Sequence, residues 1–310
     1  MLDDLNELKT FRAILAEGSL SGAARRLGVT LAVVSKRLTT LEARAGVSLI
    51  HRTTRALSAT EEGKRLLIDI EHALDAIESG EKRLAGGRDE PTGTLRVSAP
   101  VSFGRRHVAP VLGELARRHP RLGISLQLDD RLADLVSDGL DLAVRIGALA
   151  DSSSMMRKLS DNHRILVAAP SYLDRAGRPA TPADAARHDF IRYGNAFEPW
   201  RLERADGATA TLSASARLRV DNGDAVRDWA LAGLGIVLKS EIDIAEDLAI
   251  GLLERVLPEW HCGQAPIVAL FPSAQHLPLK TRVLLDELAA HVAAVLRAGR
   301  NRRQTHEAPA

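Results

Sequence analysis

Two short helical segments joined by a glycine turn constrain the fold of this chain more than any other feature. Ser19 precedes the first segment, which ends at Gly28, and Thr30 precedes the second, which ends at Gly46. Serine and threonine favour the residue before a helix, and glycine favours the residue after it. An apolar stripe upstream predicts one more amphipathic helix: Leu5, Leu8, Phe11, Ile14 and Leu15. Together these patterns predict a helix-turn-helix.

The second segment of the pair has an outward face suited to a polyanion. Four apolar residues are expected to face inward: Val33, Val34, Leu38 and Leu41. The expected outward face carries no acid: Leu31, Ala32, Ser35, Lys36, Arg37, Thr39 and Thr40. Hydroxyl and cationic groups contact phosphates and base edges in the major groove of DNA, where a carboxylate is repelled. The pattern favours DNA binding over a helical packing module that has no ligand.

The first part of the chain is basic. Residues 1–66 carry eleven Lys and Arg against seven Asp and Glu, whereas residues 67–90 carry three against seven. This asymmetry suggests a polyanionic partner, with a solvated surface as the alternative. A short strand over residues 47–50 and a polar basic loop over residues 51–55 are expected, and the loop suits phosphates or the adjacent minor groove.

The acidic segment that follows predicts a long helix that starts after Thr60 and is stopped by the segment from Gly86 to Pro91. Thr60 supplies a cap, and two glutamates follow it. Apolar residues then recur with a 3-4 alternation: Leu67, Ile70, Leu74, Ile77 and Leu84. Such a stripe is a seam for a second helix, so we expect self-pairing, with packing on the chain's own body as the alternative. A glycine- and proline-containing hinge ends this linker by residue 91.

Residues 91–300 read as an α/β body. Strands are expected at 94–100, 123–129, 140–146, 165–169, 190–193, 216–221, 235–238 and 267–271. Helices are expected at 101–118, 132–139, 224–232 and 280–296. The alternation at the start of this body predicts a parallel sheet with right-handed crossovers. Residues 301–310 are expected to form a disordered tail.

The first sixty residues resemble the N-terminal domain of LysR-type transcriptional regulators. The resemblance lies at Phe11 and in the segments Gly18–Thr30, Val34–Leu38, Leu41–Glu42, Gly46–Val47, His51–Arg55 and Thr60–Gly63. It implies that six residues lie in or beside the major groove: Thr30, Leu31, Ala32, Ser35, Lys36 and Arg37. It also implies a wing formed by Arg52, Thr53 and Arg55, with Arg55 a candidate for entering the minor groove. The N-terminal domain would therefore be a winged helix-turn-helix over residues 1–60.

Two positions depart from the family pattern. Leu31 stands where the family often has glutamine, which removes an amide that could read adenine. Ala45 stands where leucine is frequent, and its smaller side chain reduces a packing contact. The first departure bears on operator preference.

The rest of the chain resembles the effector-binding domain of the same family. The matching segments are Gly93–Val97, Asp134–Val136, Gly139–Gly147, Ala169–Leu173, Ala232–Ile236 and Pro258–Trp260. The resemblance implies a two-lobed fold like that of periplasmic binding proteins. Lobe I would comprise residues 91–167 and 270–300, and lobe II residues 168–269. The chain would cross between lobes near residues 167–170 and 267–272. The family also dimerises through a linker helix, which agrees with self-pairing over residues 61–90.

Small ligands of open α/β sheets bind beyond the carboxyl ends of strands, where helix N-termini attract anions. The residues expected there are Ser98, Pro100, Val101, Ser102, Arg145 and Asn222. They predict a site for a small, anionic effector. The alternatives are that Ser102 is only a helix cap and that Arg145 is only a surface ion-pair partner.

The sequence argues against an enzyme. The neighbours Asp129 and Asp130 would point to opposite faces of a strand, and nothing orients His261 beside Cys262. The Gly233–Gly235 segment lacks the context of a dinucleotide motif. The ten histidines are scattered and there is one cysteine, so no catalytic residues, metal site or cofactor are expected.

The expected protein is a ligand-responsive transcriptional regulator in the cytoplasm. The acidic N-terminus is unlike a secretory signal, and the longest nearly apolar run, residues 231–238, is too short to span a membrane. A solute-binding protein with the same two-lobed fold is the alternative. The expected partners are a pseudo-palindromic operator in double-stranded DNA, a small-molecule effector and a second copy of the chain. The expected assembly is a homodimer that forms a tetramer as a dimer of dimers.

Overall fold

The computed structural model describes residues 2–52, 57–84, 90–131, 135, 137–147, 155–194, 198–213, 216–272 and 277–306. The chain divides into two compact units, residues 1–93 and 94–310, and each unit is described by itself. None of the described helices is long and apolar enough to cross a membrane.

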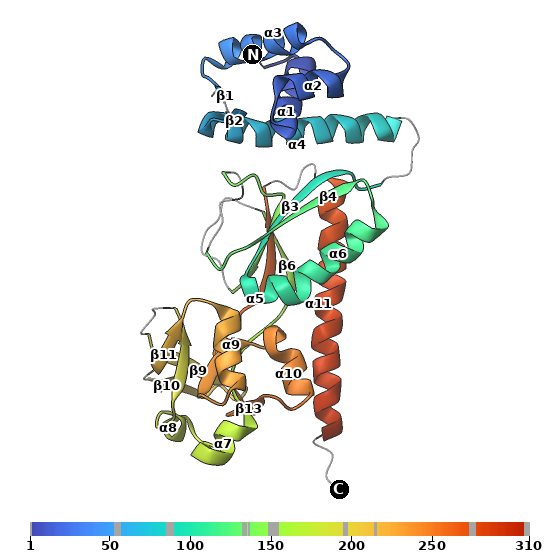
Figure 1. Ribbon diagram of the computed structural model, residues 1–310. Coiled ribbons are helices and arrows are strands. Elements are labelled where there is room, and N and C mark those ends of the chain that lie inside the picture. Colours follow the sequence, from blue (N-terminus) through green and yellow to red (C-terminus); the bar gives the residue numbers. More distant parts are fainter. Residues whose placement is uncertain are drawn as a thin grey trace. The chain divides into compact units, whose positions relative to one another are not determined.

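Helix caps set the boundaries of the N-terminal unit. The side chains of Asp4, Ser19 and Thr30 accept hydrogen bonds from backbone N–H groups in the first turns of three helices. Gly28 and Gly46 adopt φ values of 64° and 71°, a left-handed backbone that favours glycine. The unit contains α1 (Leu5–Glu17), α2 (Leu20–Leu27), α3 (Leu31–Ala45), β1 (Ile50–Arg52), β2 (Leu57–Ala59) and α4 (Glu61–Leu84) (Figure 1).

The start of α4 is fitted closely to the preceding segment. Thr60 Oγ1 accepts a hydrogen bond from the Gly63 N–H at 2.9 Å, which is the predicted cap. A Cβ atom at Gly63 would lie 2.1 Å from the Leu49 carbonyl oxygen, so only glycine lets the helix pass here. The core of the unit joins α1, α2, α3 and α4, and includes Phe11 and Leu38. The apolar stripe of α1 enters this core at Leu8, because Leu5 is 38% exposed.

Lobe I of the second unit is built on a five-stranded sheet in the order β4-β3-β5-β15-β6. β3 pairs parallel with β5, as predicted, whereas β15 is antiparallel to β5 and to β6. Its strands are β3 (Gly93–Ala99), β4 (Leu122–Leu128), β5 (Leu142–Ile146), β6 (Met155–Ser160) and β15 (Ile267–Phe271). Its helices are α5 (Val101–Phe103), the π-helical η1 (Gly104–Val108), α6 (Ala109–Arg118) and α11 (Leu279–His306).

Lobe II is built on a second five-stranded sheet in the order β11-β8-β12-β7-β13. It also contains a three-stranded sheet in the order β10-β9-β14. The strands of lobe II are β7 (Arg164–Ala168), β8 (Phe190–Tyr193), β9 (Trp200–Arg204), β10 (Thr209–Leu212), β11 (Ala216–Val220), β12 (Ile236–Ser240), β13 (Glu254–Val256) and β14 (Trp260–His261). Its helices are α7 (Pro170–Ala176), α8 (Pro182–Ala185), α9 (Gly223–Leu231), the 3-10 turn η2 (Ile242–Ile244) and α10 (Ala245–Ala249).

The chain crosses between the lobes earlier than predicted. β7 belongs to the sheet of lobe II and β15 to the sheet of lobe I, so the crossings lie at residues 161–163 and 262–266. The buried side chain of Asn162 ties them together. Its Nδ2 donates to the Ala265 carbonyl and to Ser240 Oγ, both at 2.8 Å, and its Oδ1 accepts from the Ile242 N–H at 3.2 Å. Ile242 in turn packs into the core of lobe I.

Other local predictions need correction. Residues 47–49 are not a strand, and His51 and Arg52 lie in β1 rather than in a loop. Residues 137–139 form a turn instead of the end of a helix, while residues 132–134 and 136 lie outside the described part. The backbone of α11 stays helical to His306, so the disordered tail predicted for residues 301–310 is wrong over its first six residues.

Candidate functional site

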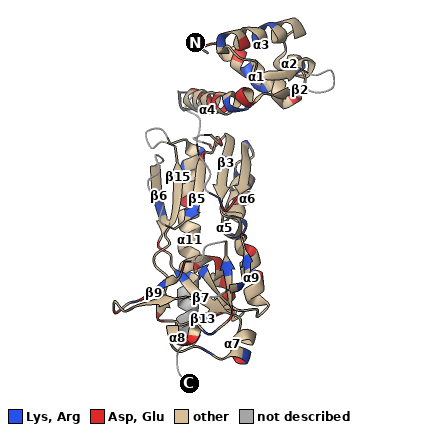
Figure 2. Cartoon of the chain, turned by 90° about the vertical axis from the view of Figure 1, so that its left-hand side faces the viewer, with Lys and Arg blue, Asp and Glu red and all other residues tan. Residues whose placement is uncertain are grey.

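The N-terminal half of α3 presents the expected polar face. Thr30 Oγ1 caps the helix by accepting from the Val33 N–H at 3.4 Å, and Lys36 is exposed. Leu31, the departure from the family pattern, is 50% exposed, and Ala32 beside it is exposed as well. The helix carries three basic residues and a single acid, Glu42 (Figure 2).

The carboxylate of Glu42 accepts hydrogen bonds within its own unit. Its Oε1 accepts hydrogen bonds from the Leu49 and Ile50 N–H groups at 2.9 and 3.3 Å, so it holds the turn that leads to β1. Its position therefore explains how an acid can occur on this helix without repelling a phosphate backbone.

Two residues of α3 differ from expectation. Val33 is 36% exposed rather than inward, because Val34, Leu38 and Leu41 already fill the core side of the helix. Arg37 is half-buried, and its Nη1 donates to Thr10 Oγ1 on α1 at 3.3 Å. Arg37 therefore helps to set the angle between α1 and α3, in addition to the role predicted for it. Ser35 is also half-buried.

The predicted wing is described only in part. β1 and β2 form an antiparallel pair that brackets it, with His51 opposite Ser58. Thr53 and Arg55 lie outside the described residues, as does the side chain of Arg52.

The stripe on α4 has two functions along its length. Ile70 and Leu74 are 2% and 5% exposed and belong to the core of their own unit, with Leu67 packed against the same core. This is the alternative that the spacing left open, so these residues do not form a free seam. Ile77, by contrast, is 38% exposed. It lies on a face of small or apolar residues that are exposed or half-exposed: Ala73, Ala76, Ile77 and Gly80.

Arg145 is buried at the end of β5 and is not a surface residue. Its Nη1 donates to the Val144 carbonyl at 2.7 Å, and its Nη2 donates to Ser98 Oγ at 3.0 Å. Among the described residues no carboxylate lies within ion-pair distance of it, and the charges of Asp129 and Asp130 act only from farther away. Burial lowers the pKa of the guanidinium, and those two carboxylates oppose the change. The structure thus brings the predicted residues Ser98 and Arg145 together.

The start of α5 already meets a carboxylate of the chain. The Val101 N–H, one of the donors predicted to face an effector, donates to Asp130 Oδ1 at 2.9 Å. Tyr193 of lobe II lies next to Asp130, and partial burial together with this carboxylate raises the pKa of Tyr193 to about 12. Pro100 precedes Val101, and both are half-buried.

Ser102 is buried where α5 meets α9 of lobe II. Its hydroxyl makes no hydrogen bond of ordinary geometry with the described residues, but lies close enough to the Asp224 carboxylate to lower its pKa. Arg105 Nη1 donates to Asp224 Oδ2 at 2.5 Å, and Arg106 Nη2 lies 3.5 Å from Oδ1. Sequence reasoning missed these three charged residues, since nothing in a single sequence pairs groups almost 120 positions apart.

Asn222 has a structural partner. Its Oδ1 accepts from the Asp224 and Ala225 N–H groups, both at 3.0 Å, and so caps α9. The residue predicted to contact an effector therefore orders the helix that carries Asp224.

A pair of histidines, also missed from the sequence, lies beside this contact. His107 Nδ1 and His291 Nε2 are 3.2 Å apart, joining η1 to α11 within lobe I. Burial lowers the pKa of His107 to about 4, although the negative charge of Asp243 in η2 acts in the opposite direction. Burial also lowers the pKa of His291.

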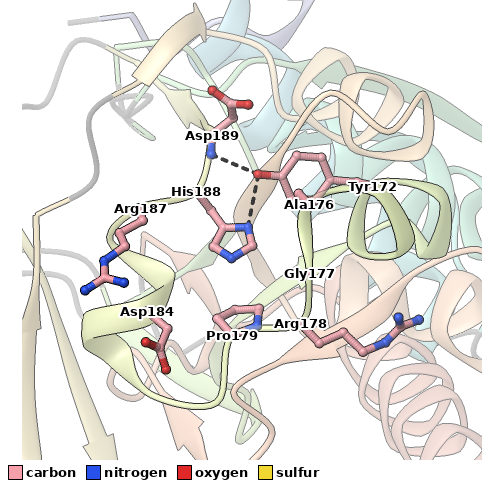
Figure 3. A pocket seen from close by; sticks show the side chains of 9 residues that line it. All are labelled: Tyr172, Ala176, Gly177, Arg178, Pro179, Asp184, Arg187, His188 and Asp189. Atoms are coloured by element: carbon pink, nitrogen blue, oxygen red, sulfur yellow. Dashed lines mark hydrogen bonds between the residues drawn. The ribbon is translucent and has the colours of Figure 1, made fainter.

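Lobe II contains an open pocket of about 370 Å³ between α7 and the segment after α8 (Figure 3). Its polar groups already serve the fold: Tyr172 accepts from the Asp189 N–H at 2.9 Å and lies 3.2 Å from His188 Nδ1. Arg178 pairs with Asp174 and Glu254 at 2.8 and 3.3 Å. We assign no ligand to this pocket.

The residues that might have indicated an enzyme do not form a catalytic arrangement. Asp129 binds the side chain of Arg131, whereas Asp130 binds the Val101 N–H. Burial raises the pKa of Cys262, the opposite of an activated thiol. No group of three potential metal ligands occurs among the described residues.

Two family comparisons match most of the chain. Residues 5–64 match the bacterial regulatory helix-turn-helix protein family of lysR type, and residues 88–293 match the LysR substrate binding domain. Among solved structures, CrgA, a LysR-type transcriptional regulator from Neisseria meningitidis, shares 29% identity and a TM-score of 0.60, covering 93% of this chain and 98% of that chain. Full-length AphB from Vibrio cholerae shares 27% identity and a TM-score of 0.57, covering 93% and 99%.

Curated relatives agree with these matches. The chain is 34% identical to the transcriptional regulator DmlR of Escherichia coli (strain K12) over 292 residues, covering 93% of this chain and 94% of DmlR. It is also 34% identical to PtxR of Pseudomonas aeruginosa over 293 residues, covering 93% of each chain. These relatives are regulators, neither enzymes nor solute-binding proteins. The chain accordingly belongs to the LysR family of transcriptional regulators, with an N-terminal DNA-binding unit and a two-lobed domain for a small-molecule effector.

Proposed function

We propose that α3 is inserted in the major groove through Thr30, Leu31, Ala32, Ser35 and Lys36, with the wing at Arg52, Thr53 and Arg55 on the flanking backbone or minor groove. The observation that carries this proposal is that the segment from Thr30 to Lys36 has no acid and exposes four of the five proposed contact residues, whereas Ser35 is half-buried. Arg37 has a smaller part in direct contact, since Thr10 already accepts one of its donors.

The matching experiment measures operator affinity over a range of salt concentrations. Capturing genomic fragments with the protein and sequencing them supplies the operator. Lys36→Ala should lower affinity for all sequences and flatten the log–log salt dependence by about 0.9 per lost phosphate contact. Arg44→Ala is the control on the same helix, because Arg44 pairs with Asp3 at 2.8 Å and Glu7 at 3.6 Å. An unchanged salt slope for Lys36→Ala contradicts the placement of α3.

The second proposed element is a homodimer formed through α4, with two dimers joining as a tetramer on a pseudo-palindromic operator in the cytoplasm. The support is the face of Ala73, Ala76, Ile77 and Gly80, whose 3-4 spacing matches a helix–helix seam. Small side chains at such a seam allow two helices to approach closely. Two copies of α3 then address two half-sites, as a two-fold symmetric dimer requires.

The third element is an anionic effector held between β3, β5 and the start of α9. Three cationic side chains support an anion: Arg105, Arg106 and the buried Arg145, which has no carboxylate partner among the described residues. Guanidinium groups bind carboxylates and phosphates through paired hydrogen bonds. Effector binding at this position changes the packing of the two lobes, because its contacts come from both.

A further inference from the structure

The contact between Asp224 and two arginines joins the two lobes through opposite charges. Arg105 and Arg106 lie in η1 of lobe I, and Asp224 lies in the first turn of α9 in lobe II. The arginine side chains are 64% and 26% exposed, whereas the Asp224 side chain is only 11% exposed. A buried carboxylate is therefore held by cations that water can reach.

Hydrogen bonds from neighbouring side chains fix the backbone at Asp224. Asn222 caps its N–H, and Lys239 Nζ donates to the Gly223 carbonyl at 3.1 Å. A Cβ atom at Gly223 would lie 3.4 Å from Ser102 Cβ, which is ordinary van der Waals contact and shows that the start of α9 lies against α5. The carboxylate thus lies against the helical segment that follows β3, in the place where an effector anion is proposed.

The local charges favour an ionised carboxylate here. Burial alone would raise the pKa of Asp224, but the Ser102 hydroxyl and then Arg106 and Arg105 outweigh it and lower the pKa. The same three side chains can donate hydrogen bonds to any carboxylate or phosphate, through one hydroxyl and two guanidinium groups. A neutral ligand that separated this pair would leave its charges without partners, at a substantial cost.

We propose that Asp224 is a built-in competitor of the effector, occupying the anion position at Ser102, Arg105 and Arg106 until a ligand carboxylate or phosphate displaces it. This inference rests on the proposed effector site and adds how that site is regulated. Displacement of Asp224 releases α9 from η1, so ligand binding is thermodynamically coupled to the separation of the lobes. Asp130 and Asp224 occupy different donors: Asp130 accepts from the Val101 N–H within lobe I and lies next to Tyr193 of lobe II, whereas Asp224 of lobe II pairs with Arg105 and Arg106 of lobe I.

The test measures binding of two probe anions, succinate and inorganic phosphate, to the full chain by calorimetry. Asp224→Asn keeps the shape of the side chain and removes its charge. The affinity of this variant for at least one probe should exceed the wild-type affinity by about tenfold or more, which corresponds to one charge-assisted hydrogen bond. Asp228→Asn is the control, because Asp228 lies one turn later in α9 with its side chain 69% exposed. Adding Arg106→Gln to Asp224→Asn should remove the gain.

Equal or weaker binding by Asp224→Asn overturns the proposal, as does failure of both anions to bind this variant, whose arginines have lost their carboxylate. Asp224→Ser serves as the second variant if Asp224→Asn does not fold, as judged by circular dichroism. Hydrogen exchange should also rise in residues 101–108 and 223–231 of the variant, and unchanged exchange there contradicts the interlobe link. None of these measurements uses DNA, so their failure is distinct from a failure of the α3 placement. If the exchange rises but neither probe binds, the anionic effector site itself is refuted together with the competition.

Discussion

Acidification should destabilise the effector-binding unit through His107. Its imidazole is buried among Phe103, His291 and the backbone of Ile242, with Asp243 as the nearest opposing charge and Arg106 as a like charge. Burial lowers its pKa from an ordinary 6.5 to about 4. The unfolded chain therefore takes up a proton at a higher pH than the folded chain does. The stabilisation from neutral His107 is complete above pH 6.5, declines as the pH falls and is absent below pH 4.

The size of the effect follows from that difference in pKa. Each pKa unit corresponds to about 1.4 kcal/mol, so the full contribution of His107 is about 3 kcal/mol, of which about 2 kcal/mol is lost by pH 5. The 3.2 Å contact with His291 adds to the sensitivity, since two imidazolium ions cannot both direct protons into it. Acid should thus loosen the packing of η1 against α11 and η2.

The assay is urea unfolding of the full chain between pH 7.5 and pH 5, followed by tryptophan fluorescence. The three tryptophans, Trp200, Trp229 and Trp260, all lie in the effector-binding unit and report on it. His107→Gln should lose about 2 kcal/mol less than wild type over this interval, because glutamine does not titrate. His119→Gln, at the half-exposed end of α6, controls for removing a histidine. Identical losses in wild type and His107→Gln would refute the reasoning.

Two other substitutions test the remaining assignments. Ile77→Glu should prevent the proposed dimer in sedimentation and weaken operator binding, because it places an unpaired charge in the proposed α4 seam; a dimer formed by this variant contradicts the pairing. Leu74→Ala should instead destabilise the N-terminal unit itself. Leu115→Ala, at a fully buried position of the lobe I core, should cost about 3 kcal/mol in urea unfolding. The exposed Glu114→Ala on the same helix should leave the midpoint nearly unchanged, and equal midpoints for both would argue against the assigned core.

The sequence predicts those elements whose ends carry their own chemical signal. Thr30 and Gly46 bracket α3 because a hydroxyl cap and a left-handed glycine act locally. β15 is predicted to the residue, since all five of its side chains are buried and the run is uniformly apolar. The edge strand β6 is not predicted, because four of its six residues are exposed and its sequence lacks the apolar pattern of a strand. Methionine and basic side chains occupy the exposed positions. α11 runs past its predicted end because polar residues alone do not stop a helix, and no proline occurs between residue 296 and Pro309.

The candidate sites divide in the same way. The face of α3 is visible in the sequence because one helix supplies all of it. The α4 stripe is ambiguous, because a core against α1 and a seam against a second chain require the same 3-4 spacing. The burial of Arg145 and the pairing of Asp224 with Arg105 depend on which strands and helices meet, so they become visible only in three dimensions.

Two of the contacts between the lobes differ in what their breaking would leave behind. At the crossings, Asn162 makes three hydrogen bonds to backbone and serine groups, and it is only 2% exposed. Breaking them would leave a buried amide unsatisfied, and withdrawing Ile242 would open a hole in the core of lobe I. The Asp224 contact, in contrast, exchanges one anion for another at arginines that water already reaches. Under the proposed competition, a ligand therefore releases the Asp224 contact at lower cost than the crossings, so we expect residues 161–163 and 262–266 to act as the pivot and the Asp224 contact to yield.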